Sequence, residues 1–190
     1  MRTSHIISST FLPVAVLFSF ASIAGSESGL YIGGSTGQAT IEFDGQTPTS
    51  ESFNFSENDT AYKIFGGYNF GVIPLIDLAI EGSYVDFGNP SMTLSSGTTI
   101  GYELSGWDAF GLAALTFGPF SVFGKAGVIA WDSDFNIGSL SGSDSGSDAA
   151  YGLGAKLQFG SLAARAEIEY FDIGNLSDVY MGSIGLSYTF

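Results

Sequence analysis

Few side chains in this chain of 190 residues could do acid–base or nucleophilic chemistry, because it has one histidine, His5, and no cysteine. His5 lies in an N-terminal stretch that is predicted below to be removed, so a Ser-His-Asp mechanism is not available to the mature protein. Without cysteine there are no disulfides, zinc–thiolate sites or cysteine-linked lipid anchors. The groups that remain for chemistry are carboxylates.

Two groups of carboxylates have a spacing that invites a specific interpretation. Glu167 and Glu169 would share one face of a strand, as a glycosidase acid pair could, but ion pairing with Lys125 or Arg165 is the favoured interpretation. The stretch "DSDFNIG" at 132–138 is similar to a calcium loop. Its glycine comes one place late, however, and Ser143 stands where a bidentate glutamate is needed. We therefore predict no active site, metal site or cofactor, and leave weak cation bridging by acidic loops open.

The beginning of the chain is typical of an exported protein. Residues 1–10 contain Arg2 and no acid, and the apolar run "FLPVAVLFSFASIAG" follows. This run is too short for a spanning helix, and Ser22 and Ala24 are the small residues that a signal peptidase reads. We predict a signal peptide over residues 1–24 and one mature domain over 25–190. A retained membrane anchor is the alternative.

The composition is apolar and acidic at once. A formal net charge of −14 argues against a nucleic-acid partner. The mean hydropathy of +0.28 is high for an exported soluble protein. The mature chain nevertheless has no run of about 18 apolar residues that could cross a membrane as a helix. Its 27 glycines and 17 phenylalanines suit strands and tight corners.

Alternation of apolar and polar residues marks eight strand segments. They cover residues 29–40, 60–70, 75–87, 102–117, 120–131, 149–159, 162–171 and 180–190. Their connections alternate between long and short, as in outer-membrane barrels, which have long loops on one rim and short turns on the other. Aromatic residues at the strand ends, among them Tyr31 and Trp131, are typical of interfacial girdles. We predict an all-β fold, an eight-stranded antiparallel up-and-down transmembrane β-barrel.

The basic residues decide which face of the strands points inward. Apart from Arg2, they all lie in the middle of predicted strands, on the polar face, and Glu81, Glu167 and Glu169 share such faces. The predicted interior ion-pair network consists of Lys63, Glu81, Lys125, Lys156, Arg165, Glu167 and Glu169. A soluble, lipocalin-like barrel would turn the apolar face inward and leave too few charges outside for solubility. A membrane barrel turns the apolar face to lipid.

Four stretches resemble the small OmpA-like outer-membrane β-barrel family. They are "AIEGSYVDFG" (79–88), "FGKAGVIAWD" (123–132), "ARAEIEYFDIG" (164–174) and the terminal "GSIGLSYTF" (182–190). The resemblance implies that Tyr188 and Phe190, at the end of the last strand, form the signal that the barrel-assembly machinery reads. It covers the barrel only, and the periplasmic peptidoglycan-binding domain of longer members is not expected in this chain.

From these observations we expect a non-enzymatic, monomeric protein of a Gram-negative outer membrane. It would contact outer-membrane lipid and lipopolysaccharide, and its acidic external loops would serve a structural role or meet a surface ligand or host partner. Two alternatives stay open. One is a narrow porin-like channel for small solutes, and the other is a soluble lipocalin-like ligand carrier.

Overall fold

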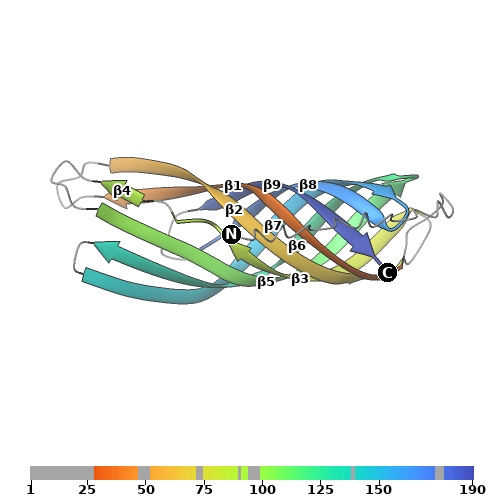
Figure 1. Cartoon of the computed structure of the whole chain (residues 1–190), viewed down its shortest axis with the longest axis horizontal. Coiled ribbons are helices and arrows are strands. Elements are labelled where there is room, and N and C mark those ends of the chain that lie inside the picture. Colours follow the sequence, from red (N-terminus) through yellow and green to blue (C-terminus); the bar gives the residue numbers. More distant parts are fainter. Residues whose placement is uncertain are drawn as a thin grey trace, which may run out of the picture.

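The computed structural model describes residues 28–46, 52–71, 75–89, 91–93, 99–137, 140–173 and 178–190. The predicted signal peptide, residues 1–24, lies outside these ranges. Within them the chain forms strands joined by short connections, and none of the described residues forms a helix long and apolar enough to cross a membrane. Figure 1 shows the strands wrapped around a single long axis.

The strands form one closed antiparallel sheet, and the predicted eight-stranded up-and-down barrel is confirmed. Each of the eight barrel strands pairs with the barrel strands before and after it, so that β3 pairs with β5, and β9 returns to pair with β1. The eight barrel strands are β1 (Gly29–Gln46), β2 (Ser52–Asn69), β3 (Ile76–Asp86), β5 (Thr99–Phe117), β6 (Phe120–Ile137), β7 (Leu140–Phe159), β8 (Leu162–Phe171) and β9 (Val179–Thr189). A three-residue strand, β4 (Ser91–Thr93), is added at the start of β5.

Several strands are longer than the alternation predicts. Residues 132–148 lie between two predicted strands, where a long loop is expected, but 132–137 belong to β6 and 140–148 to β7, which pair as a β-ribbon. The register between the two strands continues without a bulge from Phe120↔Leu157 to Ile137↔Leu140. Asp132, Asp134 and Asn136 therefore lie on a straight strand and not in a calcium loop. Serine, glycine and aspartate suggest a turn, but the ladder to β6 outweighs that local preference.

The two ends of the barrel differ, and we name them by their connections. The turn rim holds the short connections after β2, β5 and β7 and both ends of the sheet, Gly29 and Phe190. Two of its turns contain Gly118 and Gly160, whose φ angles of 61° and 59° suit a residue without a side chain. The loop rim is the opposite end. There the β1–β2 hairpin and the β5–β6–β7 strands extend past the rest of the barrel, on the left of Figure 1.

The outer face of the barrel is apolar. Leu153 and Ile168 are 71% and 69% exposed, so in water they would be costly, whereas lipid accommodates them. Exposed aromatic side chains border this apolar band near the turn rim: Tyr68, Phe70, Phe117, Phe120, Phe159, Tyr188 and Phe190. A second group borders it toward the loop rim: Tyr62, Trp107, Tyr151 and Tyr180. From Tyr180 to Tyr188 the strand rises about 20 Å at the usual tilt, close to the height of a barrel's apolar band.

Two aromatic residues that the sequence placed in these girdles point inward instead. Trp131 is buried, and its indole Nε1 donates a hydrogen bond to Asp148 Oδ2 at 2.7 Å. Tyr31 is partly buried, and its hydroxyl donates to Glu81 Oε2 at 2.9 Å. Period-two alternation explains both, because each residue shares its face with the inward residues of its own strand.

Candidate functional site: the sealed interior and the loop rim

Three basic and three acidic side chains form a compact ionic layer across the middle of the barrel. Lys63 Nζ lies 2.7 Å from Glu169 Oε2, and Lys125 Nζ lies 2.6 Å from Glu167 Oε2. Arg165 Nη1 donates to Glu81 Oε2 at 2.7 Å. No side chain in these pairs is more than 5% exposed. Because a buried charge is tolerated only when it is paired, the equal numbers of opposite charges leave each member of the layer with a partner.

The layer is cross-linked between strands that are far apart in the sequence. Lys125 contacts Glu169 at 2.7 Å and Glu81 at 3.7 Å, so it joins β6 to β8 and to β3. Arg165 Nε pairs in addition with Glu167. Aromatic rings cover the cations: the Lys125 ammonium lies 4.4 Å from the Phe110 centroid, and the Arg165 guanidinium lies 4.2 Å from that of Phe65. These cation–π contacts replace part of the lost hydration.

The lumen is narrow at this level, which keeps the network dry. A Cβ atom on Gly152 would lie 2.8 Å from Lys125 Cε, so a larger residue there would displace the lysine side chain. An eight-stranded barrel has an interior that side chains can just fill. The structure therefore brings together Lys63, Glu81, Lys125, Arg165, Glu167 and Glu169 from the predicted set.

Lys156, the seventh member of that set, lies nearer the turn rim. It stands opposite Arg165 in the β7–β8 register. It also lines a small polar cavity of about 60 Å³ together with Asp77, Asn69 and Gln158. A cavity of this size holds a few waters at most. Beside it, Thr116 donates to Asp77 Oδ2 at 2.9 Å and lies 3.0 Å from Ser121 Oγ.

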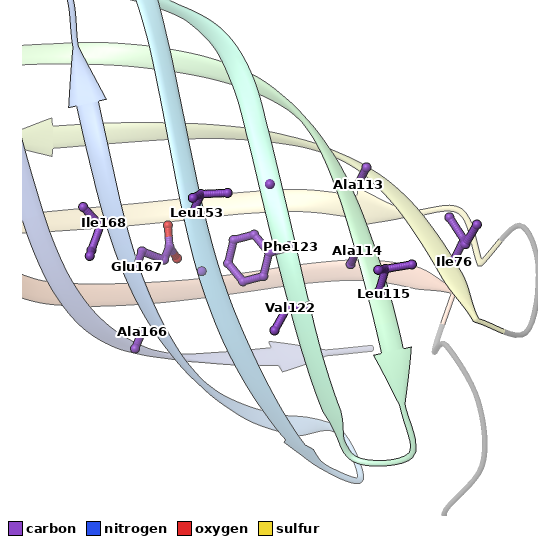
Figure 2. A pocket seen from close by; sticks show the side chains of 12 residues that line it. Ile76, Ala113, Ala114, Leu115, Val122, Phe123, Leu153, Ala166, Glu167 and Ile168 are labelled. Carbon is purple, nitrogen blue, oxygen red and sulfur yellow. The ribbon is translucent and has the colours of Figure 1, made fainter.

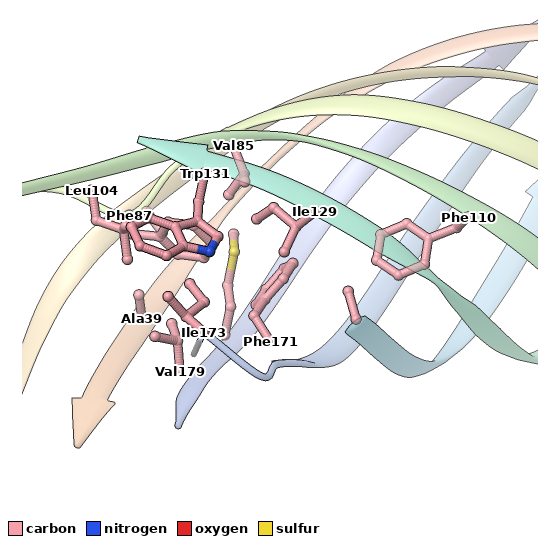
Figure 3. Close-up of a cluster of buried hydrophobic side chains, with 13 residues drawn as sticks. Ala39, Val85, Phe87, Leu104, Phe110, Ile129, Trp131, Phe171, Ile173 and Val179 are labelled. Carbon is pink, nitrogen blue, oxygen red and sulfur yellow. The ribbon is translucent and has the colours of Figure 1, made fainter. Parts of the chain in front are cut away.

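A second, apolar layer fills the barrel between the ionic layer and the loop rim. Figure 3 shows its side chains facing one another across the lumen. The rings of Phe87 and Phe171 meet edge to face at 5.0 Å between centroids. The other members are Ala39, Ala61, Val85, Leu104, Phe110, Ile129, Trp131, Ala150, Ile173, Val179 and Met181. The sequence does not predict this layer, although Phe171 stands on the polar face of its strand, which is a sign of it.

Between the two layers lies Asp108, a buried acid that the sequence does not single out. The Ser83 hydroxyl donates to Asp108 Oδ1, while Oδ2 has no hydrogen-bond partner among the described residues. In the register Ser83 and Asp108 stand directly opposite each other on β3 and β5. This cross-strand pair lies between Glu81 of the ionic layer and Val85 of the apolar layer along β3.

The loop rim is acidic. Asp132, Asp134 and Glu103 are exposed on the outward face of the extended strands, and Glu103 stands opposite Asp134 in the register. Other acids of this rim are Asp59, Asp86, Asp144, Asp148, Asp172 and Asp178. All four basic residues after Arg2 lie in the barrel strands, so none offsets these charges locally. In the described part of the chain, no three acids are placed so that they could hold a metal ion.

One depression of the outer wall is apolar and shallow. Figure 2 shows Leu115, Val122, Leu153 and Ile168 around it, and the small Ala113 and Ala166 also line it. Its volume is about 790 Å³. Because it lies within the outward apolar band, acyl chains of the surrounding lipid fit it, and no polar group placed for catalysis borders it from outside. Glu167 faces the lumen behind it, where it pairs with Lys125.

The last strand closes the barrel through its terminal residues. The Phe190 N–H donates to the Leu30 carbonyl at 3.0 Å, which ties the end of the chain to β1. Tyr188 and Phe190 both point outward, and their rings meet edge to face at 5.2 Å. The two predicted assembly residues thus form an exposed aromatic pair at the turn rim.

Comparison with known proteins agrees with this geometry. The profile of the outer membrane protein beta-barrel domain matches residues 10–190. No curated protein sequence matches the chain. Among solved structures, Ail of Yersinia pestis is 17% identical with a TM-score of 0.64, covering 87% of this chain and all of Ail. Neisserial surface protein A is 15% identical with a TM-score of 0.61, covering 86% of this chain and 98% of that one.

A third similar structure is the N-terminal β-barrel domain of OprF from Pseudomonas aeruginosa, 15% identical with a TM-score of 0.54. The alignment covers 86% of this chain and 100% of the OprF domain. At these identities the likeness concerns the fold.

Proposed function

The chain belongs to the outer membrane protein beta-barrel domain family, and from this we propose that it is a non-enzymatic outer-membrane protein of a Gram-negative cell that meets partners through its acidic loop rim. The observation that carries the proposal is the separation of charge along the barrel. The basic residues lie in the barrel strands, whereas acids such as Asp132 and Asp134 are exposed on the extended strands. A barrel whose role was confined to the lipid bilayer would not need long charged strands that extend beyond it.

The orientation follows from the connections. In outer-membrane barrels the short turns face the periplasm and the long connections face outward. The turn rim, with Tyr188 and Phe190, is then where the barrel-assembly machinery would act after removal of the signal peptide. The loop rim would stand at the cell surface, just above the aromatic girdle, next to the lipopolysaccharide headgroups. Closure of the sheet leaves no open edge within the membrane, which supports a monomer.

The charge of the loop rim also limits the kind of partner. One structure of Ail shows it in complex with the heparin analogue sucrose octasulfate, which is a polyanion. An acidic rim without lysine or arginine would repel such a ligand. We expect instead a partner with a basic surface, since opposite charges steer encounter and set specificity.

The alternative of a narrow channel rests on one feature, the polar cavity beside Lys156 at the turn rim. Two layers stand between this cavity and the loop rim: the ionic layer, and the apolar layer that contains Phe87 and Phe171. Both would have to open before a solute could pass. The alternative of a soluble carrier is opposed by Leu153 and Ile168, which face outward from the barrel wall. The arrangement supports a closed barrel.

A binding measurement with purified protein tests this role. The protein is reconstituted in nanodiscs and passed over surfaces coated with polylysine or with heparin. We expect salt-sensitive binding to polylysine alone. Neutralising Glu103, Asp132, Asp134 and Asp178 as amides should reduce it at least several-fold, while the matched interior variant Asp77→Asn keeps it. Equal binding of the neutralised variant, or preference for heparin, would show that the acidic rim is not the contact surface.

A further inference from the structure

The first part of strand β7 extends beyond the barrel. The strand pairs with β6 from Leu140 to Leu157, but its register with β8 covers only Ala150–Phe159. One more bond, from the Asp172 N–H to the Ala149 carbonyl at 3.0 Å, closes that ladder. Residues 140–148 therefore have a partner strand on one side only among the described residues. At the usual rise this free edge is about 30 Å long.

The backbone groups that face the free edge follow from the same bond. Because the Ala149 carbonyl points toward β8, the residues two, four, six and eight places before it point the same way. These are Ser141, Ser143, Ser145 and Ser147. Residues between them face β6, as the 3.3 Å hydrogen bond from the Ser133 hydroxyl to the Asp144 carbonyl illustrates. The backbone N–H and C=O groups of these four serines thus point to the free edge, in one row.

Apart from Asp144, whose contact with the edge is described below, the side chains along this edge do not protect it. Proteins usually guard a free edge with lysine, proline, a bulge or a covering segment. Residues 140–149 contain no lysine and no proline, and their register has no bulge. The free side of β2, by comparison, is covered where the Asn89 N–H donates to Asp59 Oδ2 at 2.8 Å. Serine and glycine leave room for another strand to approach the β7 edge.

We propose that the β7 edge at residues 140–148 binds an extended segment of a partner protein by strand addition, and that this segment carries lysine or arginine at alternate positions. Asp144 and Asp148 lie on one face of the edge, and the four serines lie on the other. A partner strand with basic residues on the first face and small polar residues on the second matches both faces. A second copy of this chain does not, because its own edge repeats the same acids.

One contact indicates how the edge stays unoccupied in the free protein. The Ser145 N–H donates to Asp144 Oδ1 at 2.9 Å, so the carboxylate covers an outward N–H in the middle of the edge. A lysine or arginine placed opposite Asp144 draws the carboxylate to itself. The Ser145 N–H then becomes free for the incoming carbonyl. Asp144 therefore acts twice, first as a cover and then as an ion-pair partner.

Peptide binding to the protein in nanodiscs tests this proposal, which rests on the proposed surface role. The probe is a ten-residue peptide of alternating lysine and threonine. Its control has the same composition, with all lysines first. The decisive variant is Ser143→Pro, which removes an outward N–H without touching the β6 ladder. Its matched control is Ser143→Ala, and heat-modifiable gel migration verifies that both variants fold.

We expect the alternating peptide to bind at least tenfold more tightly than the block peptide and to slow hydrogen exchange at residues 140–148. Ser143→Pro should weaken binding about tenfold, as expected for a lost ladder hydrogen bond, and Ser143→Ala should not. Equal affinity for the two peptides, or for the two variants, would overturn strand addition while leaving charge-driven surface binding intact. Dimerisation through this edge, detected by cross-linking of Ser147→Cys, would overturn the choice of partner.

Discussion

At the scale of single residues, the interior of this barrel depends on buried ion pairs whose separation is energetically costly. Glu81 accepts hydrogen bonds from Arg165 and Tyr31 and lies 3.7 Å from Lys125 Nζ. Period-two alternation predicts which charged residues face inward. It does not predict how they pair, because pairing across the lumen depends on the tilt and stagger of strands that are far apart in sequence.

The pairing predicts non-additive mutational effects. Glu81→Ala and Arg165→Ala should each lower the free energy of unfolding by about 3–5 kcal/mol, because each leaves a buried charge without its partner. The double variant should lose less than the sum, since the two residues contact each other. Urea unfolding in lipid vesicles measures all three values. Strictly additive losses would show that the two side chains do not interact.

The outward residues give a second prediction at this scale. Leu153→Arg or Ile168→Arg should cost about 2–4 kcal/mol, because the charge would stand near the middle of the apolar band. The matched change Ser145→Arg, on the exposed part of β7 beyond the girdle, should cost almost nothing. Vesicle unfolding curves compare them. If the two kinds of site tolerated arginine equally, the outer face would not be the lipid face.

At the scale of elements, the sequence predicts all eight barrel strands and the alternation of short and long connections. It does not predict how far β6 and β7 run, because Ser–Gly–Asp stretches have weak strand preference and are held by a partner strand. It also misplaces Trp131 and Tyr31 in the girdles. An aromatic residue near a strand end can point either way, and only its parity with the buried residues of the same strand decides.

The closing strand carries the third prediction. Deleting Phe190 removes the N–H that binds the Leu30 carbonyl and half of the aromatic pair with Tyr188. The amount of heat-modifiable barrel in the outer membrane should fall, and Phe190→Tyr, which retains the ring and the backbone, should restore it. Undiminished assembly of the deletion variant would show that the terminal residue is not needed as a signal.

At the scale of the whole molecule, the interior is arranged in three levels from the turn rim to the loop rim: a polar cavity, a paired ionic layer and an apolar layer. An ionic layer alone could open if its pairs rearranged. The apolar layer excludes water independently, so the two together make a stronger barrier than either one.

This arrangement predicts a protein without steady conductance. Planar-bilayer recordings of the purified wild type should show no large, stable open-channel currents. Glu81→Ala should not open a channel either, because the apolar layer remains. Replacing Phe87 and Phe171 by serine in that background is the change expected to produce current. Stable currents from the wild type would support the porin-like alternative.

We propose that the acidic loop rim of this outer-membrane barrel faces the outside of the cell. Because the chain has no cysteine, single cysteines report their own location without background. Ser145→Cys, on the loop rim, should react on intact cells with a membrane-impermeant maleimide, whereas Ser161→Cys, in the turn between β7 and β8, should react only after the outer membrane is broken. Labelling of Ser161→Cys on intact cells, with Ser145→Cys protected, would mean that the turn rim, and not the acidic loop rim, faces outward.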